Sequence, residues 1–402
     1  METKLASKSH AVTISPDQPF VVIGERINPT RRKALLESLV AGDYGIALQD
    51  ARNQVAAGAQ VLDVNAGVPG ADEPKLIAEL THAILQEVDV PLCFDSANPA
   101  ALEAALSIYN GKALINSTTG EEKMLNAVLP LAAKYHAAVI GVITDENGIS
   151  PTPEGRLAVA RKIVQRAADY AIPADDVVID CLALTVGADS NAGRVTLETM
   201  ALVRKELGLN LSLGASNVSF GLPDRKTINS AYLALGIARG LTTAITDPTV
   251  PELRNMVRAC DLLTGHDEYA MRWIKSYRAA QKASRASMFL GQEHLGLYPH
   301  RASAAEIAAW YEKMFGFKCE EGELSFFLSG PGAGRIEIMK QPADFHCHVA
   351  ILVSNFEDAV AALKSKGVAF KEPVLQPKRK LIYLQEPDPD GNLVHLLWLA
   401  ES

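Results

Sequence analysis

Carboxylate and amide side chains recur in the first two thirds of the chain, each at the end of a short apolar run. Neither Cys nor His is among them, so they describe a hydrogen-bonding pocket rather than a metal site or a nucleophilic site. A flat heterocycle rich in donors and acceptors would fit such a pocket. The side chains are Glu25, Asn28, Asp63, Asn65, Asp95, Asn116, Asp180 and Asn217, and the guanidinium of Arg26 stands among them.

A purely local role is the alternative for each of these side chains: capping a helix or tying loops together. For Asp95 this alternative is weaker, because Asn98 and Pro99 already provide a good cap and a good first helical residue. For Glu25, Arg26 and Asp63 both roles stay open, since a Glu to Arg pair is often a loop clamp.

Eight short β-branched runs must position these groups, and stretches with helical 3.6-residue periodicity separate them. Eight such units, without a GxGxxG turn, favour a parallel (β/α)8 TIM barrel over an open doubly wound sheet. In a barrel the carboxyl ends of all strands meet at one face, where the polar residues would gather. The predicted strands are 20–27, 60–66, 91–97, 113–118, 138–144, 177–184, 211–218 and 243–248.

The pattern changes after the barrel, which we assign to residues 18–265. A polar amphipathic segment predicts a linking helix over 266–286, and residues 287–402 form a second, smaller α+β domain. Within that domain EHLGLYPHRASAAEIAAWYEKMFGFK resembles CHVAILVSNFEDAVAALKSKGVAFK, which predicts two paired βαβββ modules. Each module offers one ligand-capable residue on its first strand and one on its last. These are His294 and Glu337, then His348 and His395.

Composition excludes several classes of protein. The 402 residues are 48% hydrophobic and 21% charged, which predicts folded domains, and a net charge of −8 without a basic stripe argues against nucleic acid. No leader-like or membrane-spanning apolar run occurs, so we expect a cytoplasmic protein. The five widely spaced cysteines contain no CxxC, and we expect them to be free, buried and small-hydrophobe-like.

The barrel motifs resemble the pterin-binding methyltransferases that move the methyl group of methyltetrahydrofolate to the cobalt of a corrinoid. The matching segments are GERIN (24–28), LDVNAG (62–67), CFDSAN (93–98), INST (115–118), VIDC (178–181) and GASNVSFGLP (214–223). The resemblance implies that Asp95, Asn116 and Asp180 hold the pterin ring, with Asn217 beside its N5 nitrogen. We place Glu25, Asn28, Asp63 and Asn65 in the same pocket. Two departures are an added second domain and Cys181, where several members have Pro.

The chemistry of methyl transfer agrees with these residue types. An amine leaves poorly as an anion, so N5 needs a proton or a strong hydrogen bond by the transition state. Asn217 can donate to N5 without carrying charge, and we assign catalytic roles to Asn217, Asp95 and Asp180. Partly desolvated carboxylates can anchor the ring or relay the proton. None needs to bond to the methyl group, because the protein supplies position and electrostatics.

Other pterin- or folate-binding functions share parts of this pattern. Dihydropteroate synthase shares the barrel, but its SxRPG-like turn is replaced here by NAGVPGADE and no SxRH-like segment follows the last strand. No DxHxxG corrinoid motif occurs, since Asp344 and His346 are followed by Cys347 and His348, so the corrinoid must arrive free or on another protein. The direction of transfer stays open. A folate-binding sensor or scaffold is the competing class, and family resemblance implies a homodimer.

The second domain resembles the vicinal oxygen chelate superfamily of glyoxalases, epimerases and dioxygenases. That family usually ends its second module with DPDGNxxE, whereas DPDGNLVH puts His395 in the place of Glu. His294, Glu337, His348 and His395 would suit zinc, nickel, manganese or iron, but loss of the carboxylate weakens an isomerase assignment. The alternative is a module that kept its fold and serves in dimerisation or as a lid. His300 and His346 fall outside the ligand pattern.

Overall fold

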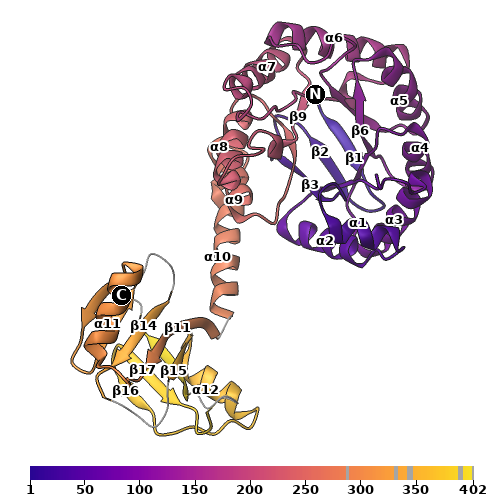
Figure 1. Cartoon of the computed structure of the whole chain (residues 1–402). Helices are drawn as coiled ribbons and strands as arrows, with labels where there is room; N and C mark the ends of the chain where they lie inside the picture. Colours follow the sequence, from indigo (N-terminus) through magenta and orange to yellow (C-terminus); the bar gives the residue numbers. More distant parts are fainter. Residues whose placement is uncertain (287–288, 330–333, 342–346, 388–392, 401–402) are drawn as a thin grey trace. The chain divides into compact units, whose positions relative to one another are not determined.

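The computed structural model describes residues 1–286, 289–329, 334–341, 347–387 and 393–400. The chain divides into two compact units, Met1–Trp273 and Ile274–Ser402 (Figure 1). Within the described residues, no helix combines the length and the apolar character that crossing a bilayer requires.

The first unit is the predicted barrel. Its parallel strands are hydrogen-bonded in the order β10-β3-β4-β5-β6-β7-β8-β9. Between β9 and β10 the backbone N of Ile245 donates to O of Leu213 at 2.9 Å, which nearly closes the ring. The strands are β3 (Val21–Ile27), β4 (Val61–Val64), β5 (Leu92–Asp95), β6 (Leu114–Thr119), β7 (Ala138–Val142), β8 (Val177–Asp180), β9 (Asn210–Ser212) and β10 (Thr243–Thr246).

Helices surround this ring of strands (Figure 1). Asn98 caps one of them by accepting a hydrogen bond from the N of Ala100 at 3.1 Å, and Pro99 is its first residue, as the sequence predicts. The helices are α1 (Lys33–Val40), α2 (Gly45–Ala57), α3 (Glu73–Glu87), α4 (Pro99–Ile108), α5 (Glu122–Lys134), α6 (Pro153–Asp169), α7 (Ala192–Leu207), α8 (Arg225–Ile237) and α9 (Pro251–Leu263), with short 3-10 turns η1 (Ala174–Asp176), η2 (Ala215–Asn217) and η3 (Glu268–Ala270).

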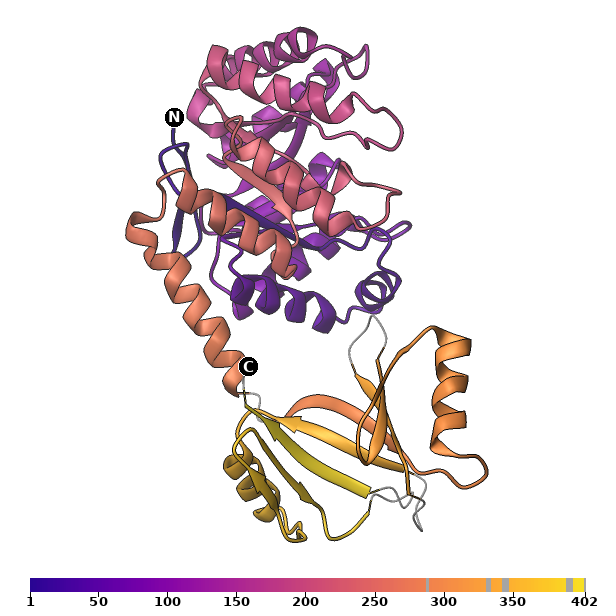
Figure 2. The same ribbon diagram turned by 90° about the vertical axis from the view of Figure 1, so that its left-hand side faces the viewer.

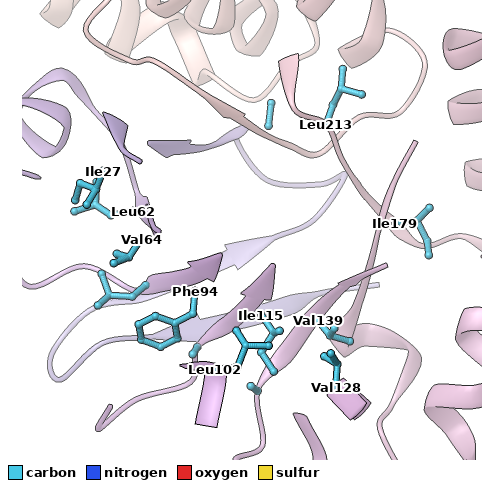
Figure 3. Packing of buried hydrophobic residues seen from close by; sticks show 14 of the residues in the cluster. Ile27, Leu62, Val64, Phe94, Leu102, Ile115, Val128, Val139, Ile179 and Leu213 are labelled. Atoms are coloured by element: carbon cyan, nitrogen blue, oxygen red, sulfur yellow. The ribbon is translucent and has the colours of Figure 1, made fainter. Parts of the chain in front are cut away.

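The barrel strands are buried on both faces, which explains their almost continuous apolar runs. Outward-facing residues such as Leu62, Phe94 and Ile179 form one large cluster with helix residues such as Leu102 and Val128 (Figure 3). Inward-facing residues form a second, smaller cluster. This two-layer packing fixes the register of each strand, and therefore which polar side chains point into the barrel.

An N-terminal hairpin, not predicted from the sequence, covers one end of the barrel. Strands β1 (Thr3–Ala6) and β2 (Ala11–Ile14) pair antiparallel inside the ring of helices (Figure 1). Leu5 and Ile14 are fully buried and join the inward-facing cluster. Asn210 of β9 anchors the hairpin, since its Nδ2 donates to O of Ile14 at 2.7 Å and to Thr3 Oγ1 at 2.9 Å. The hairpin closes the end opposite the polar residues.

The cysteines follow the sequence expectation in part. All five are free, and Cys93, Cys181 and Cys260 are buried. Cys319 and Cys347 are only half-buried, which corrects the expectation for these two. They lie on strands of the smaller second unit, where one sheet has fewer layers to cover it.

The second unit is a mixed sheet built from two βαβββ modules, as predicted (Figure 2). Its strand order is β12-β13-β14-β11-β15-β18-β17-β16, with the two first strands, β11 and β15, antiparallel at the centre. Helix α10 (Met271–Ala286) precedes the first strand of this sheet. The elements are β11 (Phe289–Leu297), α11 (Ala304–Phe315), β12 (Lys318–Glu321), β13 (Ser325–Ser329), β14 (Arg335–Met339), β15 (Cys347–Val353), α12 (Phe356–Lys364), β16 (Val374–Gln376), β17 (Arg379–Tyr383) and β18 (Leu393–Leu399).

Each helix of this unit covers the half-sheet of its own module. Ala304 and Ala308 of α11 pack against Leu328 and Ile338, and α12 packs in the same way against β17 and β18. Because side chains alternate along a strand, the residues next to Ile338 and its equivalents face the opposite side of the sheet. That side carries the predicted ligand residues.

Candidate functional site

The polar residues of the barrel lie where strand alternation puts them. Ile23, Val61, Cys93, Leu114 and Val178 belong to the inward-facing cluster. Two residues later, the same face of each strand must carry the next side chain towards the carboxyl end. Those side chains are Glu25, Asp63, Asp95, Asn116 and Asp180. Five of the predicted site residues therefore point into one end of the barrel.

Hydrogen bonds join several of them directly. Asp95 Oδ2 accepts from Nδ2 of Asn65 at 2.9 Å and from Nδ2 of Asn28 at 3.4 Å. Asp63 Oδ1 accepts from Nδ2 of Asn116 at 3.1 Å. Residues on or just after β3, β4, β5 and β6, predicted separately, thus form two hydrogen-bonded groups, and the charge interaction between Asp63 and Asp95 joins them into one polar network. Amide donors partly satisfy the carboxylates and leave other oxygens for a ligand.

Burial changes the acidity of this network. Asp63 is only 2% exposed, and burial, helped by the nearby charge of Asp95, raises its pKa well above the usual range. Burial also raises the pKa of Asp95, and that of Asp180 to about 6. Carboxyls with raised pKa values exchange protons closer to neutral pH, which suits groups that accept N–H donors or relay a proton.

Hydrogen bonds to Asp180 and from Arg156 hold the loop that follows β8 in place. Leu182 N donates to Asp180 Oδ1 at 2.7 Å, and Arg156 of α6, which is 2% exposed, donates from Nη1 to O of Cys181 at 3.3 Å and to Thr196 Oγ1 at 3.0 Å. Cys181 itself packs in the outer cluster with the helices, away from the barrel interior. Sequence analysis missed Arg156, because one Arg in an amphipathic helix normally faces solvent.

Asn217 lies apart from this network. It is exposed in the 3-10 turn η2 and, among the described residues, its side chain has no hydrogen-bond partner. Its neighbour Ser216 donates to Oε1 of Glu25 at 2.9 Å, which ties η2 to β3. Burial raises the pKa of Glu25 to about 7, with the charge of Asp247 adding to the rise. Glu25 therefore positions the turn that carries Asn217.

Arg26 links neighbouring segments as a loop clamp, one of the two roles that the sequence left open for it. Its guanidinium lies 3.9 Å from Asp50 of α2 and 3.6 Å from Asp247, and its backbone N donates to Oε1 of the fully buried Gln54 at 2.9 Å. Asp247 was missed by the sequence analysis. It follows inward-facing Ile245 by two residues, the same spacing that identified the other carboxylates.

The second unit brings all four predicted metal ligands together. The available ligand atoms of His294, His348 and His395 lie within 4.8 Å of one another. His294 Nε2 lies 2.9 Å from His348 Nε2 and 3.0 Å from Glu337 Oε2, and His348 Nε2 lies 3.5 Å from the same oxygen. The three imidazoles are 1–2% exposed and Glu337 is 9% exposed.

Other side chains hold the far atoms of these ligands. Ser325 donates to Glu337 Oε1 at 2.7 Å, the hydroxyl of Tyr298 lies 3.2 Å from His348 Nδ1, and Glu293 contacts His294 Nδ1. Metal-binding imidazoles are generally oriented in this way, by a partner on the second ring nitrogen. The converging atoms are therefore His294 Nε2, His348 Nε2 and Glu337 Oε2. Sequence analysis identified none of these three partners.

His395 and Gly296 complete the geometry. Neither ring nitrogen of His395 has a hydrogen-bond partner among the described residues, and burial beside two imidazoles lowers its pKa to about 3, so the ring is neutral. Gly296 pairs with Glu337 on one side and His348 on the other. A Cβ there would lie 1.9 Å from the His348 ring. Asp344, His346 and the DPDGN segment (388–392) lie outside the described residues.

Comparisons with known proteins agree with this division. The "Pterin binding enzyme" family matches residues 24–247, and the "Glyoxalase/Bleomycin resistance protein/Dioxygenase superfamily" matches residues 292–396. A methylcorrinoid:tetrahydrofolate methyltransferase of Eubacterium limosum is 27% identical over 267 residues, covering 64% of this chain and 96% of that protein. Methionine synthase of Mycobacterium tuberculosis is 28% identical over 257 residues, covering 61% of this chain but only 22% of that enzyme.

Solved structures show the fold alone at this level of identity. The dihydropteroate synthase of Yersinia pestis, solved with a pterine-sulfa conjugate, is 18% identical with a TM-score of 0.51, covering 65% of this chain and 99% of that chain. The family match instead spans more than half of the sequence and includes every polar residue described at the barrel mouth. This chain therefore belongs to the pterin binding enzyme family.

Proposed function

We propose that the protein moves a methyl group between N5 of (methyl)tetrahydrofolate and the cobalt of a corrinoid supplied from outside the chain. The observation that supports this proposal is the carboxylate and amide network at the barrel mouth, with Asn217 exposed on the turn η2 that Ser216 ties to Glu25. The names of the relatives, a methylcorrinoid:tetrahydrofolate methyltransferase and methionine synthase, support the same reaction.

The proposed roles divide between holding the ring and assisting its N5. Asp95, Asn116 and Asp180 would accept and donate hydrogen bonds at the pterin ring, with Asp63 and Asn65 supporting them. Asn217, whose amide is free of other partners among the described residues, would donate to N5 as the C–N bond breaks or forms. The corrinoid, when bound, provides the metal that gives or receives the methyl group. An exposed Asn217 leaves N5 accessible to it.

Replacing Asn217 separates this enzyme from a folate-binding sensor. We expect Asn217→Ala to reduce single-turnover methyl transfer by at least about a hundredfold, the scale of losing one transition-state donor, while tetrahydrofolate binding by calorimetry changes little. Asn53→Ala, an exposed amide on α2, is the matched control. Wild-type protein that binds folate but transfers no methyl group would favour the sensor. Formation of dihydropteroate would favour a dihydropteroate-synthase-like enzyme.

We also propose that the second unit holds a divalent metal ion. The donor set fits one: two imidazole Nε2 atoms and a carboxylate oxygen converge, their far atoms are anchored, and buried His395 offers an unpartnered nitrogen. Zinc, nickel, manganese and iron all accept nitrogen and carboxylate ligands. A bound ion would supply Lewis acidity. Asp or Glu at position 395 is absent, so the chain itself lacks the carboxylate base of an isomerase there.

Measuring the metal content of the protein tests this second proposal and requires no assay of enzyme activity. Full-length protein loaded with each ion and desalted should retain about one metal per chain by mass spectrometry. We expect His395→Ala and Glu337→Gln to lower the retained metal by at least about tenfold, while His300→Ala leaves it unchanged. Equal retention in all variants would place the metal elsewhere and favour a lid or dimerisation module.

We further propose that the protein acts in the cytoplasm as a homodimer. The sequence expectation supports the first and the family resemblance of the barrel supports the second, which light scattering on the purified full-length chain tests. A mass near 86 kDa, about twice the 43.1 kDa of one chain, supports a dimer. A mass of one chain at micromolar concentration would reject it.

A further inference from the structure

An exposed aromatic side chain stands at the rim of the barrel mouth. Phe220 follows Asn217 by three residues in the loop after β9, and 47% of its surface is exposed. The guanidinium of Arg31 lies over the ring, 4.4 Å from its centroid. Arg31 follows Asn28 by three residues in the loop after β3. The pair thus joins two loops that each carry a side chain of the candidate site.

Backbone contacts hold this pair in place. Phe220 N donates to O of Asn217 at 3.2 Å, and O of Phe220 accepts from Thr185 Oγ1 at 2.7 Å, which adds the loop after β8. Arg31 has a φ of 61°, a left-handed conformation that disfavours most side chains. Three loops therefore converge to keep a large apolar ring and a cation in solvent. The ring and the cation are therefore available to a ligand that approaches the barrel mouth.

We propose that Arg31 and Phe220 form the docking surface for the corrin ring. The inference rests on the proposed function, because methyl transfer requires the corrin ring to approach the methyl group beside Asn217. A corrin is flat and much wider than a pterin, so its edge must extend from N5 over the rim. Methyl groups on that edge would cover the Phe220 ring, and its amide oxygens would accept hydrogen bonds from Arg31.

Binding of free cobalamin tests the surface without turnover. Equilibrium dialysis of hydroxocobalamin against full-length protein gives its Kd, and calorimetry gives the Kd of tetrahydrofolate. We expect Phe220→Ala to weaken cobalamin binding by at least about fivefold, the scale of one aromatic and cation–π contact, and to leave folate binding within about twofold. Phe220→Tyr, which keeps the ring, should bind as wild type. Ile108→Ala, 43% exposed at the end of α4, is the matched control.

The outcomes separate this inference from the proposed function. Methyl transfer by wild type together with unchanged cobalamin binding in Phe220→Ala would overturn the docking surface and keep the reaction. Equal weakening of cobalamin and folate would show that Phe220 only stabilises the loop, and would also overturn it. Selective loss of cobalamin binding in a protein that transfers no methyl group would support the surface and reject the reaction.

Discussion

Removing the charge of Asp180 should stabilise the ligand-free barrel while destroying its ligand site. Burial raises the pKa of this carboxyl from 3.8 to about 6. The folded state therefore binds the proton more tightly than the unfolded chain, and the free energy of unfolding falls as pH rises through this window. One pKa unit corresponds to about 1.36 kcal/mol, so ionised Asp180 destabilises the barrel by up to about 3 kcal/mol at pH 8.

Asp180→Asn removes this cost and keeps an acceptor for Leu182 N, which donates at 2.7 Å. We expect the variant to exceed wild type in unfolding free energy at pH 8 by about 1–3 kcal/mol, and to equal it near pH 3. Hydrogen exchange of β8 peptides in urea measures this for the barrel within the full-length chain. Tetrahydrofolate binding should weaken by at least about tenfold, because one acceptor oxygen becomes an NH2 group that cannot accept an N–H donor of the ring.

Two results would refute this reasoning. The first is a variant that is no more stable than wild type at pH 8 and whose unfolding free energy has the same pH dependence between pH 4 and 6. It would show that burial does not disfavour the ionised form of Asp180. Undiminished folate binding would show that Asp180 does not contact the ring. Asp169→Asn, an exposed carboxylate at the end of α6, controls for a general effect of net charge.

Three further predictions concern the N-terminal hairpin, the candidate metal ligands and the turn carrying Asn217. Leu5→Ala should lower the barrel's unfolding free energy by about 2–5 kcal/mol in urea titrations, because Leu5 is fully buried at the end that the hairpin covers. A loss under about 1 kcal/mol would show that the hairpin does not pack into the barrel core. Gly296→Ala should displace His348 and abolish metal retention while circular dichroism is unchanged; retained metal would contradict the cluster. Glu25, with a pKa of about 7, should hold Ser216 more firmly when ionised, so turnover rises from pH 6 to 8. Glu25→Gln should flatten that rise, and an unaltered profile would exclude Glu25 as its cause.

One rule accounts for where the sequence predicts polar side chains to gather at the barrel mouth. Each strand carries inward-facing side chains at every second position, so Asp63, Asp95 and Asp180 follow directly from the apolar residues before them. The same rule reaches Asp247 from Ile245, and Asp247 lies inside the predicted strand 243–248, but it was not named as a site residue.

Tertiary contacts account for what the sequence did not predict. The hairpin strands of Thr3–Ala6 and Ala11–Ile14 are four residues each, too short for a distinct pattern, and only the barrel end makes Leu5 a core residue. Arg156 lies in an amphipathic helix, and its burial depends on the loop after β8. Tyr298 and Ser325 contact the candidate metal ligands His348 and Glu337 across strands, a relation that spacing along the chain does not contain.

Single-turnover optical spectroscopy tests the central claim most directly. The full-length protein is mixed with methyltetrahydrofolate and cob(I)alamin, and separately with tetrahydrofolate and methylcobalamin, and the cobalt spectrum is followed. The account predicts conversion in at least one direction, loss of it in Asn217→Ala, and normal conversion in Asn53→Ala. No conversion in either direction, with free cobalamin or with the corrinoid protein of a related methyltransferase, while folate still binds, would contradict it.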